Sequence, residues 1–262
     1  MTTLEEIVAY TRTLVERRKA EQPLPDLKDE IAVRPPALDF AAALNVGMVA
    51  LIAEVKKASP SRGLIRSDFD HLAIAEAYAL SGASAVSVLT EPRFFLGTLD
   101  YLADVASSPI AHSVPLLRKD FIIDPYQVYE ARAHGADAVL LIAAILDRER
   151  LDSLLALSHD FGMMCLVEVH NERDIDLALS SEARVIGINN RDLHSFKVDL
   201  STFELLRPLV PAERLVVAES GIHGSADIRR LARVGVDAVL VGEALMTAGD
   251  IAAMTREFAC AA

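Results

Sequence analysis

Gly82-Ala-Ser-Ala-Val-Ser-Val-Leu89 is a sequence pattern that occurs twice more in the chain, as Gly135-Ala-Asp-Ala-Val-Leu-Leu-Ile142 and as Gly235-Val-Asp-Ala-Val-Leu-Val-Gly242. In each copy a helical segment ends at glycine, a favoured helix C-cap, and an apolar strand with β-branched residues comes next. Near-continuous apolar strands are typical of parallel sheets whose two faces are both buried. The repeat therefore predicts strand–helix units built around a parallel sheet.

Five more strands of the same kind complete the pattern, at residues 49–55, 114–118, 163–169, 184–188 and 215–218. Helical segments separate them, among them residues 69–80, 125–133, 147–158, 226–234 and 251–259. Eight such units have the size of a (β/α)8 barrel, which typically takes about 250 residues. The competing open, doubly wound sheet would carry a GxGxxG turn after its first strand, which this chain lacks. We predict the α/β class and a (β/α)8 TIM barrel.

The residues before the first strand predict an N-terminal helical extension. Apolar residues such as Leu4, Ile7 and Leu14 fall at helical spacing over residues 4–19, prolines interrupt residues 20–38, and Asp39 is a suitable N-cap for a short helix at 40–44. We expect residues 1–46 to pack on a barrel of residues 47–262, so that the whole chain is one domain.

Composition narrows the class of protein. The 262 residues carry a formal charge of -12, which argues against general binding to nucleic acid or acidic membranes and requires a local basic pocket for any anion. There is no disulfide framework, CxxC pair or histidine pair at metal-ligand spacing, and no apolar run long enough to cross a bilayer. We therefore expect a cytoplasmic protein without a metal site or a membrane segment.

Charged and polar residues end seven of the eight predicted strands. In barrel enzymes the site lies at the carboxyl ends of the strands. The residues that we expect to face it are Glu54, Lys56 and Ser59 at the first strand, Lys119 at the third, Glu168 at the fifth, Asn189 and Arg191 at the sixth, Glu219, Ser220 and Gly221 at the seventh, and Gly242 and Glu243 at the eighth.

Alternation along a strand places Lys119 on the face of Leu117, Glu168 on that of Leu166 and Glu219 on that of Val217. Two lysines and three glutamates would then converge on the barrel mouth. Interactions among these charges would raise the pKa values of some groups and lower those of others, as an acid–base site requires. The alternative is a ring of mutually satisfied ion pairs that closes the top of the barrel.

The loops after the seventh and eighth strands suggest a phosphate site. Gly221 and Gly242 would expose backbone N–H groups there, assisted by Ser59 and Lys56, although the carboxylate of Glu243 is an unfavourable neighbour for a phosphate. The phenylalanines after the second and third strands, Phe94, Phe95 and Phe121, are either walls for an aromatic substrate or simply core. Of the histidines only His170 is expected near the site, as a hydrogen-bonded loop residue; His194 and His223 are placed in loops.

The motifs AEVKKASPS, LLRKDFI, LVEVHNE, IGINNRDL, VAESGI and LVGEALM, in this order along the chain, resemble those of indole-3-glycerol phosphate synthases of tryptophan biosynthesis. The resemblance implies conversion of 1-(2-carboxyphenylamino)-1-deoxyribulose 5-phosphate to indole-3-glycerol phosphate, CO2 and water, without a cofactor. It implies that Lys119 is the general acid of ring closure and that Glu168 handles protons in the dehydration. Lys56, near Glu54, would be a second acid or a substrate anchor.

By the same resemblance, Asn189 and Arg191 orient the substrate, Glu219 and Ser220 complete the polar wall, and Ser59, Gly221 and Gly242 hold the phosphate. We expect burial and cationic neighbours to lower the pKa of Lys119 toward neutrality, which would suit a proton donor. The partner is a small-molecule substrate, and the chain would be a monomer or a weak homo-oligomer.

Two other functions compete with this one. A Schiff-base lyase built on another phosphate-binding barrel would use Lys119 as a nucleophile. A non-catalytic phosphate-binding subunit could keep the glycine loops but would be free to lose Lys119 and Glu168, which this chain has kept.

Overall fold

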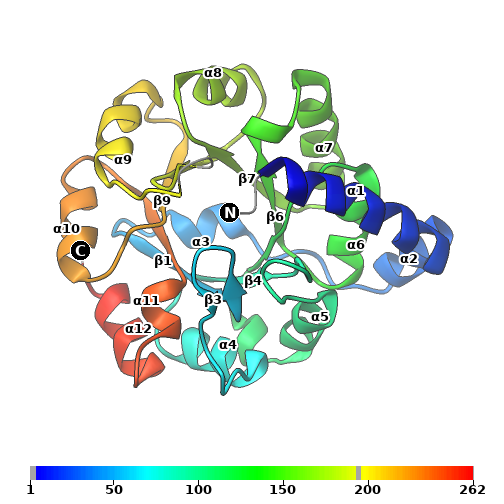
Figure 1. The fold of residues 1–262 in the computed structure, drawn as a ribbon, viewed down its shortest axis with the longest axis horizontal. Helices are drawn as coiled ribbons and strands as arrows, with labels where there is room; N and C mark the ends of the chain where they lie inside the picture. Colours follow the sequence, from blue (N-terminus) through cyan, green and yellow to red (C-terminus); the bar gives the residue numbers. More distant parts are fainter. Residues whose placement is uncertain (1–3, 193–195, 262) are drawn as a thin grey trace.

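Eight parallel strands form a closed barrel in the computed structural model, which describes residues 4–192 and 196–261. Their order around the barrel is β1-β10-β9-β8-β7-β6-β5-β4, and helices surround them (Figure 1). The strands are β1 (Ala50–Val55), β4 (Ala85–Leu89), β5 (Leu116–Lys119), β6 (Ala138–Ile142), β7 (Met164–Val169), β8 (Val185–Asn189), β9 (Leu215–Glu219) and β10 (Ala238–Val241). Each overlaps a predicted strand, so the predicted (β/α)8 barrel is confirmed.

The helices around the barrel are α4 (His71–Leu80), α5 (Leu99–Ser107), α6 (Pro125–Ala133), α7 (Arg148–Asp160), α8 (Glu172–Ser180), α9 (Ser201–Leu206), α10 (Ser225–Ala232), α11 (Glu243–Met246) and α12 (Ile251–Ala259). Short 3-10 turns occur at η1 (Ala111–Ser113), η2 (Ala143–Ile145) and η3 (Arg207–Leu209). The loop after β1 forms a small antiparallel hairpin of β2 (Ala58–Ser59) and β3 (Gly63–Leu64), which the sequence pattern did not predict.

Local sequence signals set the ends of these helices. The first residue of each copy of the repeated pattern is a glycine with a left-handed φ angle, as C-cap glycines have. The angles are 92° at Gly82, 87° at Gly135 and 80° at Gly235. At the other end, the aspartates before α4 and α12, Asp70 and Asp250, accept hydrogen bonds from the first-turn N–H groups. The repeat therefore encodes the helix-to-strand turns of the barrel.

Two apolar layers lie on either side of the sheet. The outer layer packs strand residues such as Val86 and Val167 against the surrounding helices. The inner layer fills the barrel with side chains that include Ile52, Leu117 and Leu166. The inner layer also contains Val217, and Leu117, Leu166 and Val217 lie two positions before Lys119, Glu168 and Glu219. The predicted face of each of these charged side chains is therefore confirmed. The barrel thus has a mainly apolar interior, and charged side chains gather at the carboxyl ends of its strands.

The chain before the barrel contributes α1 (Leu4–Glu21), α2 (Leu24–Ala32) and α3 (Phe40–Leu44). Helix α3 begins at the predicted cap, since Asp39 accepts a hydrogen bond from the N–H of Ala42, and it closes the interior with Phe40 and Leu44. Helices α1 and α2 pack on α6 through a cluster that contains Leu27 and Tyr126. The three N-terminal helices therefore pack directly on the barrel and its helix α6.

Figure 1 shows α1, in dark blue, beside α6 and in front of β6 and β7. Its Lys19 pairs with Asp124 at 2.8 Å, and the backbone carbonyl groups of Arg18 and Gln22 accept hydrogen bonds from the hydroxyl of Tyr126. These contacts fix α1 to the segment that comes after Lys119.

Within residues 4–192 and 196–261, no helix has both the length and the apolar character needed to span a membrane.

Candidate active site

One cavity of about 380 Å³ lies at the carboxyl ends of the barrel strands. Fourteen residues that the sequence predicted for the site line it, from β1 round to α11, whereas Phe94 and His170 do not. The fourteen are Glu54, Lys56, Ser59, Phe95, Lys119, Phe121, Glu168, Asn189, Arg191, Glu219, Ser220, Gly221, Gly242 and Glu243. The barrel closure brings together residues that lie up to 189 positions apart in the sequence, because the ends of parallel strands share one rim.

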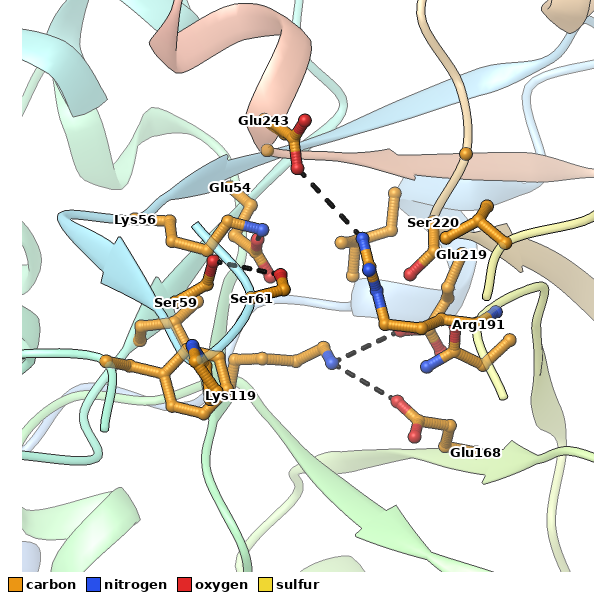
Figure 2. A pocket seen from close by; sticks show the side chains of 18 of the residues that line it. Glu54, Lys56, Ser59, Ser61, Lys119, Glu168, Arg191, Glu219, Ser220 and Glu243 are labelled. Carbon is orange, nitrogen blue, oxygen red and sulfur yellow. Dashed lines mark hydrogen bonds and ion pairs between the residues drawn. The ribbon is translucent and has the colours of Figure 1, made fainter. Parts of the chain in front are cut away.

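Lys119 lies between two carboxylates at the floor of the cavity (Figure 2). Its Nζ is 3.2 Å from Oε2 of Glu168 and 3.2 Å from Oε2 of Glu219. The three side chains are nearly buried, with exposed fractions of 14%, 3% and 2% for Lys119, Glu168 and Glu219. Within the described residues, neither oxygen of Glu219 accepts a well-aligned hydrogen bond, so its contact with Lys119 is an ion pair.

The charges in this cluster move its pKa values apart. Burial alone would lower the pKa of Lys119, but the nearby carboxylates, with Glu219 and Glu168 the strongest, raise it above its ordinary value. The expectation that the pKa of Lys119 is lowered is therefore wrong: its neighbours are anionic rather than cationic. Burial also opposes the ionisation of Glu168, yet Lys119 and then His170 hold the pKa of Glu168 well below its usual range.

Glu219 titrates in the opposite sense from Glu168. Burial raises the pKa of Glu219, Lys119 lowers it less, and the neighbouring charge of Glu168 adds to the rise. Two carboxylates that share one ammonium cannot both ionise cheaply, so their pKa values move in opposite directions. The site thus sets a carboxylate that ionises readily beside one that holds its proton more tightly, which is the pairing that acid–base chemistry needs.

A second ion pair faces the same cavity from β1. Nζ of Lys56 lies 2.7 Å from Oε2 of Glu54, and both side chains are mostly buried. Gly242 makes room for this pair, because a Cβ atom at Gly242 would collide with the carboxylate of Glu54 and press on Nζ of Lys56. Glycine at this position is therefore required by the charged pair as well as by the loop.

Glu219 depends on glycine too. A Cβ atom on Gly187 of β8 would collide with Oε1 of Glu219, so the carboxylate occupies the space that a side chain would take. Directly after Glu219, Ser220 has a left-handed φ of 64°, which is uncommon for a residue other than glycine, and Gly221 adopts 79°. Such strained backbone is typical of functional sites. It turns the chain sharply at the cavity rim.

Glu243 does not face the cavity as an isolated charge. Its Oε1 pairs with Nη2 of Arg62 at 2.5 Å, and its Oε2 lies 4.0 Å from Nη2 of Arg191. The backbone N–H of Arg191 donates to Oδ1 of Asn189 at 3.0 Å, and its Nη1 donates to the carbonyl oxygen of Phe196 at 3.3 Å. Two guanidinium groups therefore neutralise a carboxylate that would be an unfavourable neighbour for a phosphate. Figure 2 shows Glu243 facing Arg191 across the cavity.

The aromatic wall contains two of the three candidate phenylalanines. The rings of Phe95 and Phe121 lie with centroids 6.1 Å apart, and both line the cavity. Phe94 instead packs edge-on against Tyr10 of α1, with centroids 5.9 Å apart. The buried carboxylate of Glu91 shapes this loop by accepting hydrogen bonds from the N–H groups of Phe94 and Phe95, which places Phe95 toward the cavity.

Several residues at the site were missed by sequence reasoning. Arg62 lines the cavity from the unpredicted β2–β3 hairpin, and Leu4 and Ile7 bring α1 to its edge. His223 also lines it, whereas His194 lies outside the described residues. Only Arg62 had a local signal, three residues after Ser59 in a turn. The approach of α1 depends on tertiary packing and leaves no mark in the local pattern.

A closed (β/α)8 barrel whose mouth gathers two lysines, two arginines, three buried glutamates and an aromatic wall defines a barrel enzyme for an aromatic, anionic substrate. Comparison with known proteins identifies its family. The family model described as "Indole-3-glycerol phosphate synthase" matches residues 4–258. The chain belongs to the indole-3-glycerol phosphate synthase family, the carboxy-lyases of tryptophan biosynthesis.

Relatives with this name match nearly the whole chain. The indole-3-glycerol phosphate synthase of Dehalococcoides mccartyi (strain CBDB1) is 58% identical over 97% of this chain and 98% of its own. That of Roseiflexus castenholzii is 52% identical over 98% and 97%. Among solved structures, 3-hexulose-6-phosphate synthase from Salmonella typhimurium has a TM-score of 0.64 at 14% identity, over 81% of this chain and 98% of that one. This last similarity shows the fold alone.

Proposed function

We propose that the cavity carries out the three steps of indole-3-glycerol phosphate synthesis with its own side chains, Lys119 and Glu168 dividing the proton transfers. The substrate is 1-(2-carboxyphenylamino)-1-deoxyribulose 5-phosphate. The observation that carries the proposal is the position of Nζ of Lys119, 3.2 Å from Glu168 and from Glu219 in a nearly buried cluster. A proton donor and an acceptor this close together suit proton transfers to and from neighbouring atoms of one substrate, which supports the proposal.

Lys119 acts in ring closure. The aromatic carbon that bears the carboxylate attacks the substrate carbonyl, a C–C bond forms, and the carbonyl oxygen takes a proton from the ammonium of Lys119. The surrounding carboxylates keep Lys119 protonated, so it enters each cycle charged and stabilises the negative charge that develops on oxygen. The same charge state disfavours a Schiff-base lyase, because a nucleophilic lysine must first lose its proton.

Decarboxylation and dehydration come next. The C–COO⁻ bond breaks and its electron pair returns to the ring system as CO2 leaves. The hydroxyl group then takes a proton from a lysine ammonium of the cavity and departs as water. Glu168 accepts the proton that the ring releases as its aromaticity is restored, and the lysine and Glu168 return to their starting protonation states by exchange with solvent. Its lowered pKa keeps Glu168 ionised for this step. Lys56, paired with Glu54, anchors the substrate or serves as a second acid.

The remaining side chains bind the two anionic ends of the substrate. Arg191, oriented by Asn189, faces the carboxylate, and Phe95 and Phe121 enclose the aromatic ring. Ser59 and the backbone N–H groups near Gly221 and Gly242 receive the phosphate, and Ser220 and Glu243 complete the rim. We further propose a cytoplasmic enzyme that is a monomer or a weak homo-oligomer.

The reaction is tested by mixing purified protein, treated with a chelator, with the substrate and monitoring indole fluorescence. We expect turnover by the wild type and a loss of roughly 100-fold or more for Lys119→Ala. Lys57→Ala is the matched control, since Lys57 lies one residue after Lys56 but packs its Nζ over the ring of Phe69, outside the cavity. Full activity of Lys119→Ala would overturn the role of Lys119.

A further inference from the structure

His170 comes directly after β7 and lies behind Glu168, outside the lining of the cavity. Its Nε2 is 3.3 Å from Oε1 of Glu168, the oxygen that does not face Lys119. Its Nδ1 is 3.7 Å from Oδ2 of Asp174, and only 9% of the His170 side chain is exposed. The imidazole therefore bridges one carboxylate of the cavity and one carboxylate outside it.

Asp174 is itself fixed by the first turn of α8. Its Oδ2 accepts hydrogen bonds from the backbone N–H of His170 at 3.0 Å and from Nδ2 of Asn171 at 3.2 Å. Within the described residues, neither ring nitrogen of His170 makes a well-aligned hydrogen bond. The interaction of the imidazole with both carboxylates is therefore electrostatic. When it is protonated, its positive charge lies between the negative charges of Glu168 and Asp174.

Charge balance in this buried region requires a second cation. Glu168 and Asp174 bring two negative charges, and Lys119 supplies a single positive one. A protonated His170 supplies the other, and the cluster is then neutral if Glu219 retains its proton. A buried cluster with unbalanced charge would cost several kcal/mol. The charged groups that face Glu168 or its partners are Lys119 on β5, Glu219 on β9, Glu54 on β1 and Asp174 on α8. From β8, the neutral side chain of Asn189 also lies beside Glu168.

We propose that His170 is a positioning residue for Glu168: a cation, anchored by Asp174, that keeps the Glu168 carboxylate ionised and turned toward the cavity. The proposal rests on the role in proton transfer given to Glu168 above. Although burial lowers the pKa of His170, the two carboxylates outweigh it and raise that pKa to about 9. His170 is therefore charged across the pH range in which Glu168 must act as a base.

Loss of the positive charge of His170 is expected to shift the pH profile of kcat/KM. Glu168 accepts a proton only when it is ionised, so activity falls as the pH drops through its pKa. Removal of the positive charge of His170 raises that pKa, and the acid limb of kcat/KM moves to higher pH. We expect a shift of about 1 pH unit or more, the size that an opposite charge within about 4–6 Å usually produces.

The experiment compares pH profiles of kcat/KM for wild type, His170→Gln and His170→Lys. His170→Gln keeps a polar side chain without a charge, whereas His170→Lys restores a cation. We expect the acid limb to shift in His170→Gln and to return toward the wild-type position in His170→Lys. His71→Gln is the matched control, because Nε2 of His71 also pairs with a carboxylate, at 2.8 Å from Asp104, but outside the cavity.

A His170→Gln profile whose acid limb stays in the wild-type position would overturn the proposal, even if activity falls uniformly, because a purely structural role lowers activity at every pH. Thermal unfolding of each variant shows whether it is folded. NMR titration of the His170 ring gives a second test, and a ring that loses its proton at its ordinary pKa would also contradict the proposal. If Glu168→Gln keeps full activity, the role given to Glu168 has failed instead, and the two failures are distinguishable.

Discussion

Nζ of Lys56 lies 2.7 Å from Oε2 of Glu54, two residues earlier in the chain, and both groups face the cavity. The pair holds a cation at the rim beside the backbone of Gly242, where the substrate phosphate is proposed to bind. The carboxylate both orients the ammonium and competes with the phosphate for it. Lys56 has two candidate roles, as an anchor of the substrate or as a second acid, and a substitution at Lys56 distinguishes them by its separate effects on binding and on catalysis.

Lys56→Met is expected to weaken binding more than chemistry if Lys56 is an anchor. We expect KM to rise by roughly 10-fold, equivalent to about 1.4 kcal/mol, with a smaller change in kcat. Steady-state kinetics and inhibition by inorganic phosphate measure the two effects. If kcat falls while KM and the phosphate inhibition constant stay unchanged, Lys56 acts as a general acid rather than as an anchor.

Gly187→Ala is expected to displace the carboxylate of Glu219, since the added methyl group would collide with Oε1. Overpacking of this kind costs about 1–3 kcal/mol in stability, and we expect kcat to fall as Glu219 moves from Lys119. Urea unfolding and kcat measure both. Gly249→Ala is the control, because nothing lies within 4 Å of a Cβ atom there, and equal effects of the two substitutions would contradict the account.

Glu243→Gln tests the balance of charge at the rim. The carboxylate pairs with Arg62 and faces Arg191, so its removal frees two cations beside the proposed phosphate site. A charge a few ångströms away in water is worth about 1 kcal/mol, so we expect inhibition by inorganic phosphate to tighten roughly 5-fold at low salt. Glu204→Gln, which removes a similar exposed pair with Arg230, serves as the control. Weaker inhibition would show that Glu243 is needed to hold the arginines.

The raised pKa of Glu219 gives stability a pH dependence. The folded protein binds this proton more tightly than the unfolded chain, whose value is near 4.5, so stability falls as the pH rises from there through the raised pKa. The slope reaches about 1.4 kcal/mol per pH unit for one such group. Urea unfolding at about pH 5 and pH 6.5, where His170 stays protonated in the folded state, should show a shallower decline for Glu219→Gln than for wild type. An unchanged slope would mean that Glu219 is ionised in the folded protein.

The sequence predicted the barrel because strand and helix periods are local properties. Apolar runs located all eight strands, three of them directly after the C-cap glycines of the repeat, and alternation from Leu117 to Lys119 predicted the inward face correctly. Strands as short as Ala58–Ser59 and Gly63–Leu64 are too brief to show a period, so the hairpin that carries Arg62 was missed. The site residues could be collected because each lies just after a strand end, and all strand ends meet at one rim.

Electrostatic state was less predictable than position. The pKa of Lys119 was expected to fall because the sequence gives no distances between charges, and the deciding fact is that two carboxylates lie 3.2 Å from its Nζ. His170 was expected as an ordinary loop residue for the same reason, since its contact with Glu168 depends on how β7 turns into α8. Pairings of this kind are set by the closed barrel rather than by neighbouring residues.

The division of proton transfers between Lys119 and Glu168 is the central claim, and a single-turnover experiment tests it most directly. Substrate with a radiolabelled carboxylate reports CO2 release, and indole fluorescence reports the final dehydration. We expect Lys119→Ala to release neither CO2 nor indole product, because ring closure precedes both. We expect Glu168→Gln to release CO2 while indole fluorescence lags by roughly 100-fold or more. If Glu168→Gln instead slows CO2 release and fluorescence equally, Glu168 acts before decarboxylation and the proposed division is wrong.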